Sequence, residues 1–282
     1  MSELLIKDGA SVNKYLATMG VGTTGAAFHN IPADFYTEVQ KGNVVGHSII
    51  EKFAHNDAVP NGSWEGVLQV AAQFVFLTAA TKVRVKAGGD AADTAAGAGA
   101  QAVTVEGLDT NGDFVSESIE LAGAAASALT TALFWRVFRA YVTPLRSGSY
   151  TAAVPTAAIV IENGTGGTDL ITIIAGEGQT AYGSYSIPLG KTGHLISLRL
   201  SSESTKSSNF RLYTRASLTD VTTPFAPKLI KRHWDGVAGI EPIVTRASML
   251  VIPALTDIWF DCYGAGAISQ CSVDFEILLV DD

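Results

Sequence analysis

An Asn-Gly turn between two alternating segments constrains this chain more than any other feature. Apolar and polar residues alternate over 102–108 and 114–121, and the residues between them read Asp-Thr-Asn-Gly-Asp. Glycine accepts the positive φ of a tight turn and asparagine tolerates it, so the pattern is a strong signal for a β-hairpin. Residues 82–86 alternate in the same way. We therefore expect antiparallel β-structure in this part of the chain.

The same pattern continues along the sequence. Further runs of Val, Ile, Leu and aromatic residues are separated by clusters of Gly, Asp, Asn and Thr, as the strands of a sandwich or barrel are separated by turns. These runs cover 74–77, 159–162, 170–174, 194–200, 210–215, 228–234, 247–252, 257–263 and 271–280. We predict an all-β fold of two antiparallel β-sandwich, jelly-roll-like domains over 61–183 and 184–282, preceded by an extended, irregular N-terminal arm over 1–60.

Two segments, 122–133 and 88–100, are rich in small residues and do not fit this pattern of strands and turns. Residues 122–133 are rich in alanine and could open a helix that runs on to 139, but the β-branched and aromatic residues of 134–142 favour a strand. Residues 88–100 read GGDAADTAAGAGA and contain almost no bulky side chain. A segment of this composition suits a loop that packs closely against something else.

The arm is punctuated by glycine and proline, and aromatic residues are spread along it. We expect it to lie across the body or across a neighbouring subunit. Arginines in the aromatic-rich segment 134–142 add to this set, because arginine with aromatics is common at protein interfaces and on sugar-binding faces. Solvated arginines at strand edges are the alternative. The candidate subunit contacts are Tyr15, Phe28, Phe35, Tyr36, Phe53, Arg136 and Arg139.

The amino-acid composition limits the kinds of partner that this chain is expected to bind. Hydrophobic residues make up 47% of the chain and charged residues 16%, well below the usual quarter. A chain so poor in charge buries much of its surface within itself or against other chains. The net charge of −8, without a basic run beyond 228–232, argues against binding to nucleic acid.

The sequence also indicates the cellular compartment in which the chain folds. No apolar run approaches the length that spans a bilayer, and the first residues lack the basic segment and cleavage site of a secretory signal. We expect a protein that folds in a cytosol and does not enter a membrane. In a reducing compartment Cys262 and Cys271 are expected to be small buried apolar residues, with a pairing across a terminal hairpin as the alternative.

No motif identifies a catalytic, metal or cofactor site. The five histidines stand in no metal-ligand spacing, and we interpret His55-Asn56-Asp57 as a turn. The glycines of 20–25 match the dinucleotide fingerprint, but the residues before them, 15–19, make a poor strand and Pro32 follows soon after. The segment 109–113 lacks the glycine position of a calcium loop. Paired carboxylates for glycoside hydrolysis stay open, since no pair distinguishes itself.

Several segments together resemble virion structural proteins of tailed bacteriophages. They are the run GGDAADTAAGAGA at 88–100 with VTVEGLD at 103–109, RVFRAYV at 136–142, AGEGQT at 175–180, IPLGKT at 187–192 and the terminal VDD. The likeness covers roughly residues 45–282, and its motifs are structural rather than catalytic. It implies a β-sandwich component of a phage particle, such as a capsid decoration protein or a fibre or tail subunit.

These observations give one expectation and one alternative. We expect a non-enzymatic virion protein, assembled in the bacterial host cytoplasm, that needs no cofactor and binds the major capsid protein or tail subunits as a decoration or cement protein. A homo-oligomer, for instance a trimer, would multiply many weak contacts. The alternative is a tail or fibre component that binds a host-surface glycan through loops carrying Trp64 or Trp234.

Overall fold

The computed structural model describes residues 5–7, 13–15, 34–70, 73–146, 148, 151–152, 154–164, 167–218, 220, 226–244 and 250–282, without the side chains of 5–7, 13–15 and 241–244. Its contacts divide the chain into two compact units, Met1–Val44 and Val45–Asp282. Each unit is described by itself.

The first unit contains more regular structure than the expected irregular arm. Strands β1 (Leu5–Lys7) and β2 (Asn13–Tyr15) pair antiparallel, with Leu5 opposite Tyr15. Helix α1 (Phe35–Gln40) ends in a turn in which Glu38 binds both Lys41 and Asn43 through its carboxylate. These two bonds lower the pKa of the Glu38 carboxyl.

The second unit is all-β, as predicted. Its strands are β3 (His47–Val59), β4 (Glu65–Gly66), β5 (Val83–Val85), β6 (Ala102–Leu108), β7 (Phe114–Glu120), β8 (Arg136–Thr143), β9 (Ile159–Asn163), β10 (Asp169–Ile173), β11 (Ser184–Ser186), β12 (Lys191–Ser202), β13 (Ser208–Ala216), β14 (Leu229–Val237), β15 (Gly239–Val244), β16 (Leu250–Ile252), β17 (Thr256–Gly264) and β18 (Ser269–Asp281). All named pairings between these strands are antiparallel.

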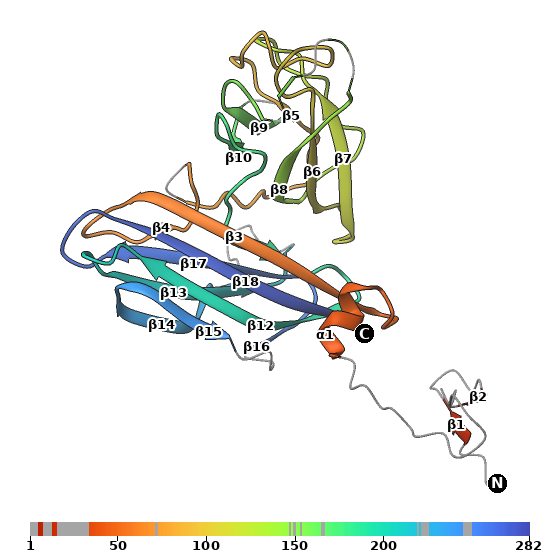
Figure 1. The fold of residues 1–282 in the computed structure, drawn as a ribbon, viewed down its shortest axis with the longest axis vertical. Helices are drawn as coiled ribbons and strands as arrows, with labels where there is room; N and C mark the ends of the chain where they lie inside the picture. Colours follow the sequence, from red (N-terminus) through yellow and green to blue (C-terminus); the bar gives the residue numbers. More distant parts are fainter. Residues whose placement is uncertain are drawn as a thin grey trace, which may run out of the picture. The chain divides into compact units, whose positions relative to one another are not determined.

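The described strands of this unit form four sheets, most of whose strands are labelled in Figure 1. One five-stranded sheet, which we call the front sheet, has the order β15-β12-β18-β3, with β16 also paired to β12. A second, the rear sheet, has the order β11-β17-β13-β14, with β4 also paired to β17. Two three-stranded sheets, β7-β6-β8 and β10-β9-β5, form the part we call the β5–β10 lobe.

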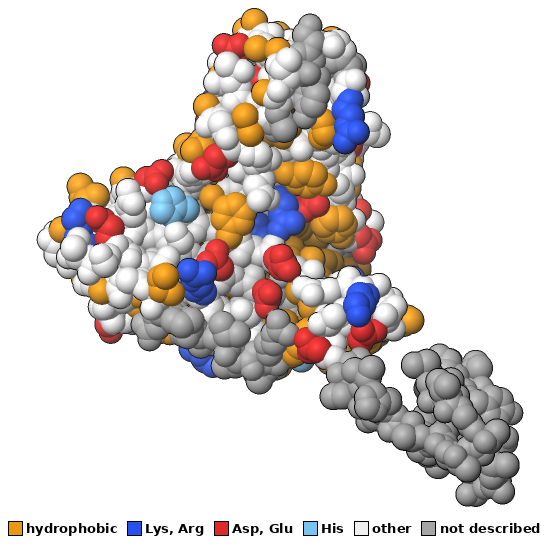
Figure 2. Space-filling model, viewed as in Figure 1, with side chains coloured by type: hydrophobic (Ala, Val, Ile, Leu, Met, Phe, Trp, Pro, Cys, Tyr) orange, Lys and Arg blue, Asp and Glu red, His pale blue; other side chains and the backbone are white. Residues whose placement is uncertain are grey.

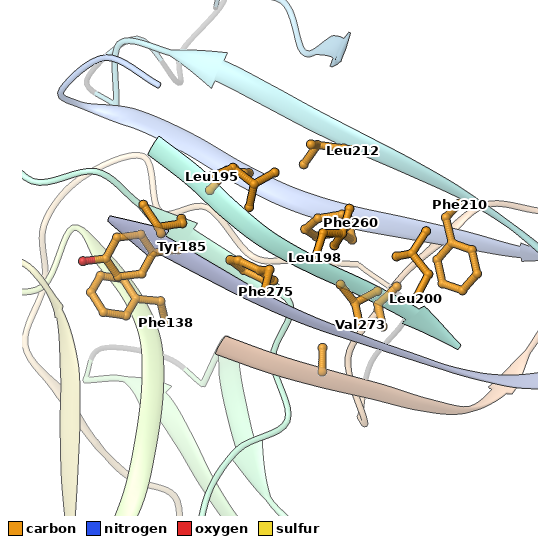
Figure 3. Packing of buried hydrophobic residues seen from close by; sticks show 14 of the residues in the cluster. Phe138, Tyr185, Leu195, Leu198, Leu200, Phe210, Leu212, Phe260, Val273 and Phe275 are labelled. Atoms are coloured by element: carbon orange, nitrogen blue, oxygen red, sulfur yellow. The ribbon is translucent and has the colours of Figure 1, made fainter. Parts of the chain in front are cut away.

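The front and rear sheets share one apolar core (Figure 3). Alternate residues of β12 and β18, among them Leu198 and Phe275, meet alternate residues of β13 and β17, among them Phe210 and Phe260. The rings of Phe260 and Phe275 lie 5.2 Å apart across the two sheets. The period-2 alternation predicted for 210–215 is confirmed, because Phe210, Leu212 and Thr214 are all buried.

Cys262 and Cys271 lie in this core as free, buried thiols. The thiol of Cys271 is hydrogen-bonded to that of Cys262, and this contact together with burial raises the Cys262 pKa. The expectation of two small buried residues is confirmed.

The hairpin predicted over 102–121 is present. Strands β6 and β7 pair in register from Ala102 opposite Glu120 to Leu108 opposite Phe114. In the turn, a carboxylate oxygen of Asp109 accepts the backbone N–H groups of Asn111 at 2.8 Å and Asp113 at 3.0 Å. Gly112 takes φ 86°, in the region that favours glycine. The segment 134–142 is a strand, as favoured, because β8 pairs with β6 along its length.

The small-residue segment 88–100 folds around a buried carboxylate. Asp93 accepts backbone N–H groups from Ala100 at 2.9 Å, Thr156 at 2.9 Å and Ala157 at 3.1 Å. A Cβ on Gly99 would clash with the Asp93 carboxylate. The close packing expected of this loop is thus explained by one acidic residue that needs small neighbours.

Two expectations from the sequence are wrong. Residues 47–59, placed in the arm, form β3, which pairs with β18 from His47 opposite Val280 to Val59 opposite Ser269. Residues 74–77, expected to be a strand, form none. Their aromatic side chains cover the outer face of the rear sheet instead, with Phe74 4.8 Å from Tyr182 and Phe76 5.2 Å from Trp259 between ring centroids.

A buried ion-pair network joins the β5–β10 lobe to the rear sheet. Asp257 of β17 is completely buried, and Arg136 of β8 is 3% exposed. The Arg136 guanidinium donates two bonds to the Asp257 carboxylate, at 2.9 and 3.1 Å. Arg215 of β13 donates a further bond at 2.7 Å, and the Ser186 hydroxyl of β11 donates another at 2.6 Å. One carboxylate therefore ties four strands together.

The remaining guanidinium hydrogens of Arg136 are also used. They donate to the backbone carbonyls of Leu77, Trp135 and Leu218 at 2.9–3.2 Å. The ring of Phe76 lies 4.3 Å from the Arg215 guanidinium carbon and 5.3 Å from that of Arg136. Cation–π contact and exclusion of water both strengthen such a network.

We expect Arg136→Met to destabilise the second unit by about 3–5 kcal/mol, because it leaves the Asp257 carboxylate buried with too few partners. Chemical denaturation measures this change. Lys86→Met is the control, since Lys86 and Asp169 form a half-exposed ion pair in the same lobe and its loss should barely move the midpoint. Equal effects of the two substitutions would contradict a structural role for the Asp257 network.

Candidate functional site

A hollow lies on the outer face of the front sheet, where that sheet meets the β5–β10 lobe. It has a volume of about 570 Å³ and is lined by β3, β12 and β18, with Arg139 and Gln179 at its rim. A second hollow of about 530 Å³ shares Arg139 and Gln179 and adds Glu106 and Tyr141. We call the two together the groove. Acidic and basic side chains gather on the visible face of this region (Figure 2).

Strand register sets the lining of the groove. Because side chains alternate across a sheet, every second residue of three neighbouring strands projects outward in rows. One row is Glu51, Glu276 and Ser197, and the next is Phe53, Asp274 and Arg199. Burial raises the pKa of Asp274, and the charge of Arg199 opposes this. The groove thus combines carboxylates, guanidiniums and one exposed aromatic ring.

A buried lysine lies beneath the groove. Lys52 of β3 donates from Nζ to the backbone carbonyl of Phe138, and Nζ lies 5.8 Å from the Phe138 ring and 5.9 Å from the Tyr182 ring. Burial lowers the pKa of Lys52 well below its usual value, and the charge of Arg139 adds to this. The contact joins the edge strand of the front sheet to β8, so Lys52 fixes the wall of the groove.

The predicted contact residues fall into three groups. Phe28 and the side chain of Tyr15 lie outside what the structure describes. Phe35 and Tyr36 lie together on α1, with ring centroids 5.4 Å apart, and Phe35 is exposed. Phe53 is 37% exposed in the groove.

The two candidate arginines, Arg139 and Arg136, differ in their burial. Arg139 lies at the rim of the groove, donates to the backbone carbonyl of Glu51 and approaches Glu106 at 3.7 Å. Arg136 is enclosed by the Asp257 network, so its assignment as a subunit contact is wrong. In the pairing of β8 with β6, Arg139 stands opposite Glu106 and Arg136 opposite Leu108, which are alternate residues of β6. The register shift between Glu106 and Gly107 thus leaves both arginines on one face of the sheet, and Arg136 lies at the end that the Asp257 network encloses.

The structure also brings together residues that the sequence did not single out. Glu51, Asp274, Glu276 and Arg199 meet because β3 pairs with β18 and β18 with β12. Gln179 joins them because it pairs with Tyr141 of β8. The alternating pattern of 273–280 indicates outward positions for Asp274 and Glu276. Nothing in the sequence indicates that residues 47–59 are their neighbour.

Trp64 belongs to a separate cluster on the rear sheet. Its ring lies 3.9 Å from the Arg211 guanidinium carbon and stacks on Tyr263 at 5.5 Å, with His233 edge-on at 5.6 Å. Its faces are therefore occupied by side chains of this chain. Trp234 packs partly buried against the shared core. The glycan alternative assigns Trp64 and Trp234 to loops, but Trp234 lies within strand β14.

Next to Trp64 lies a buried carboxyl. Asp261 of β17 pairs with Gly66 of β4, and one of its carboxylate oxygens is buried with no hydrogen-bond partner. Burial raises the pKa of Asp261 to about 6, although Lys228 and Arg211 act in the opposite direction.

The described ranges contain neither a metal-binding cluster nor a membrane-spanning helix. They hold no group of three or more His, Cys, Asp and Glu side chains arranged to bind a metal ion. No helix within them has the length and apolar character needed to cross a membrane.

We expect Asp261→Asn to raise the free energy of unfolding by roughly 2–3 kcal/mol at pH 8. The ionised form is disfavoured in the fold, so the wild type carries this cost above pH 6 and loses it as the pH falls through 6 towards 4. The advantage of the variant should therefore shrink at pH 4. Urea denaturation at both pH values measures it, with Asp113→Asn as an exposed control. An advantage that does not change with pH would contradict the assignment.

Comparison with known proteins leaves the family open. No family model matches the chain, and no curated protein matches it. Among solved structures, one of infectious bursal disease virus, Gt strain, is 9% identical and covers 84% of this chain and 73% of its own, with a TM-score of 0.24. Another, of the Gx strain, is 8% identical with coverages of 83% and 75% and a TM-score of 0.20. Likenesses this weak establish neither a shared fold nor a shared function.

Proposed function

We propose that this chain is a structural protein of a tailed-phage virion, most directly a capsid decoration protein, and that its copies associate through one edge of the front and rear sheets. The sequence resemblance over residues 45–282 supports the class of protein. The low content of charged residues supports burial against other subunits. We further propose that the front and rear sheets form a jelly-roll-like sandwich and that the β5–β10 lobe is the second such domain.

An apolar edge carries the proposal for association. β14 ends the rear sheet, and β15 and β16 end the front sheet on the same side, since β14 and β15 are joined by a short turn. Figure 1 shows these three strands along one border of the sheets. Four large aliphatic side chains on them are 50–59% exposed: Leu229, Ile230, Ile240 and Val251.

Edge strands of this kind are normally protected. A row of unpaired backbone groups beside exposed aliphatic side chains is a template for pairing with another chain. β14 and β15 each have a strand neighbour on one side only among the described residues. Pairing with a second copy would bury the aliphatic side chains and satisfy the backbone at the same time.

We expect the double substitution Ile230→Lys with Ile240→Lys to shift the wild-type oligomer to a smaller species, because two charges would be buried in the contact. Sedimentation velocity over a range of protein concentrations measures this. Ile268→Lys is the control, since Ile268 is equally exposed but lies in the turn between β17 and β18. A wild type that is monomeric at every concentration, or a control that dissociates as readily, would remove the proposed contact.

A glycan-binding tail or fibre component is the second candidate, and the groove is the observation that favours it. Phe53 offers an exposed ring on which the apolar face of a sugar can stack, and Asp274, Glu276, Arg199 and Gln179 surround it with polar groups. A concave site with one apolar platform and several fixed polar groups is typical of small polar ligands.

For this candidate, Phe53→Ala should weaken binding to cell-surface polysaccharide at least tenfold while the melting temperature stays near that of the wild type, because Phe53 lies outward from the sheet. Glycan arrays and calorimetry measure the change. Phe114→Ala serves as the control, since Phe114 is a half-exposed phenylalanine outside the groove. An array on which the wild-type protein binds no glycan would exclude this second candidate.

A further inference from the structure

A Ser-His-Asp chain of hydrogen bonds lies on the outer face of the front sheet. The Ser272 hydroxyl is 2.7 Å from Nδ1 of His55, and Nε2 of His55 is 2.7 Å from Oδ1 of Asp57. A carboxylate can only accept, so the hydrogen of the neutral ring is on Nε2 and Nδ1 carries the lone pair that accepts the Ser272 hydroxyl. These are the contacts of a nucleophile, a general base and the group that orients the base.

Strand register holds the three residues in place. Ser272 of β18 stands directly opposite His55 of β3, and Asp57 follows two residues later on the same face of β3. The pairing then shifts between Ser269 and Cys271, so β3 has one extra residue there. β-Bulges recur beside active sites because they redirect a side chain. His55 and Ser272 are half-buried, which limits their rotamers while leaving them accessible.

A small cavity opens on this chain of residues. It has a volume of about 210 Å³ and is lined by His55, Ser272, Ser201, Ser202, Glu203 and Gln270 among others. This volume suits an acetyl-sized group rather than a whole sugar or peptide. The Ser201 hydroxyl and the Gln270 carboxamide are the side chains of the cavity that can donate to a developing oxyanion.

We propose that Ser272, His55 and Asp57 form an esterase site for small acyl esters, with O-acetyl groups as the substrate class. Ser272 Oγ attacks the carbonyl carbon while its proton passes to Nδ1 of His55. The C–O bond to the alcohol then breaks, and the alcohol leaves with that proton. Water attacks the acyl-serine, Nδ1 takes its proton and returns it to Ser272 Oγ, and the acid is released. One ester and one water give one acid and one alcohol.

The roles of the two ring nitrogens are exchanged relative to the serine proteases, in which the serine contacts Nε2. The chemistry is unchanged, because either nitrogen of a neutral imidazole accepts a proton when the other donates. The expectation that His55 and Asp57 form only a turn did not include Ser272, which is 217 positions away from His55 in the sequence.

The site adjoins the groove. Phe53 and His55 are alternate residues of β3, and Asp274 and Ser272 are the matching residues of β18, so the two rows are about 7 Å apart. A sugar ring stacked on Phe53 would hold its substituents within reach of Ser272. This arrangement links the esterase to the glycan alternative, but the activity on a free ester depends on neither proposed function.

Covalent labelling tests the assignment on the full chain. An alkyl fluorophosphonate should label the wild type at Ser272, as located by peptide mass spectrometry, and labelling should fall at least 100-fold in Ser272→Ala and in His55→Gln. Hydrolysis of p-nitrophenyl acetate should fall in parallel, and Asp57→Asn should lower it at least tenfold. Ser48→Ala is the control, as an exposed serine of the strand that carries His55 but outside this cavity, and it should leave the labelling at Ser272 unchanged.

Circular dichroism and thermal melting show whether each variant folds, and a folded His55→Gln decides the outcome if Ser272→Ala does not fold. Absence of label at Ser272 in the wild type would overturn the proposal. Labelling that persists in folded His55→Gln would also overturn it, because the histidine would then not activate the serine.

Discussion

The carboxylate of Asp257 is the interaction on which the second unit depends. A carboxylate removed from water is very unfavourable unless its lone pairs are satisfied, and here two guanidiniums and one hydroxyl satisfy them. The donors come from β8, β13 and β11, and the acceptor from β17. Front and rear sheets share an apolar core that many residue combinations could fill. The Asp257 network constrains the orientation of the β5–β10 lobe as well, because its hydrogen bonds to the Arg136 guanidinium require a defined distance and direction.

The shape of the groove depends on this fixed orientation of the β5–β10 lobe. The groove has one wall on the front sheet and one on β8, so its shape requires that the lobe does not rotate. Lys52 adds a second tie between these walls through the backbone of Phe138. The edge formed by β14, β15 and β16 lies away from the lobe along the strand order of both sheets. Association through this edge would therefore leave the groove open.

The sequence predicts local structure well and long-range pairing poorly. The hairpin at 102–121 is encoded within 20 residues, because Gly112 and Asp109 specify the turn and alternation specifies the register. Strand β3 is not recognisable in this way, since its partner β18 lies more than 200 positions later and its own pattern is irregular. Residues 74–77 have the composition of a strand, but their rings are used to cover Trp259 and Tyr182 rather than to pair.

The difficulty of predicting long-range strand pairing also explains why some site residues could not be identified from the sequence. Arg136 and Arg139 look equivalent in the sequence, and only the long-range contact of Arg136 with Asp257 of β17 distinguishes the buried residue from the one at the groove. His55 and Asp57 are adjacent enough to be noticed, whereas Ser272 becomes their neighbour only when β3 joins the sheet. Conversely, the composition of residues 88–100 was enough to predict a closely packed loop. It did not show that the loop packs around the carboxylate of Asp93.

Crosslinking between copies tests the central claim of edge-mediated assembly most directly. An equal mixture of unlabelled and ¹⁵N-labelled protein, treated with a short amine-reactive crosslinker, separates links between copies from links within one copy. Links between copies should concentrate on Lys228 and Lys231, which lie beside and within β14. Links between copies that instead concentrate on Lys86 or Lys191, or their absence at concentrations where the protein is oligomeric, would contradict assembly through this edge.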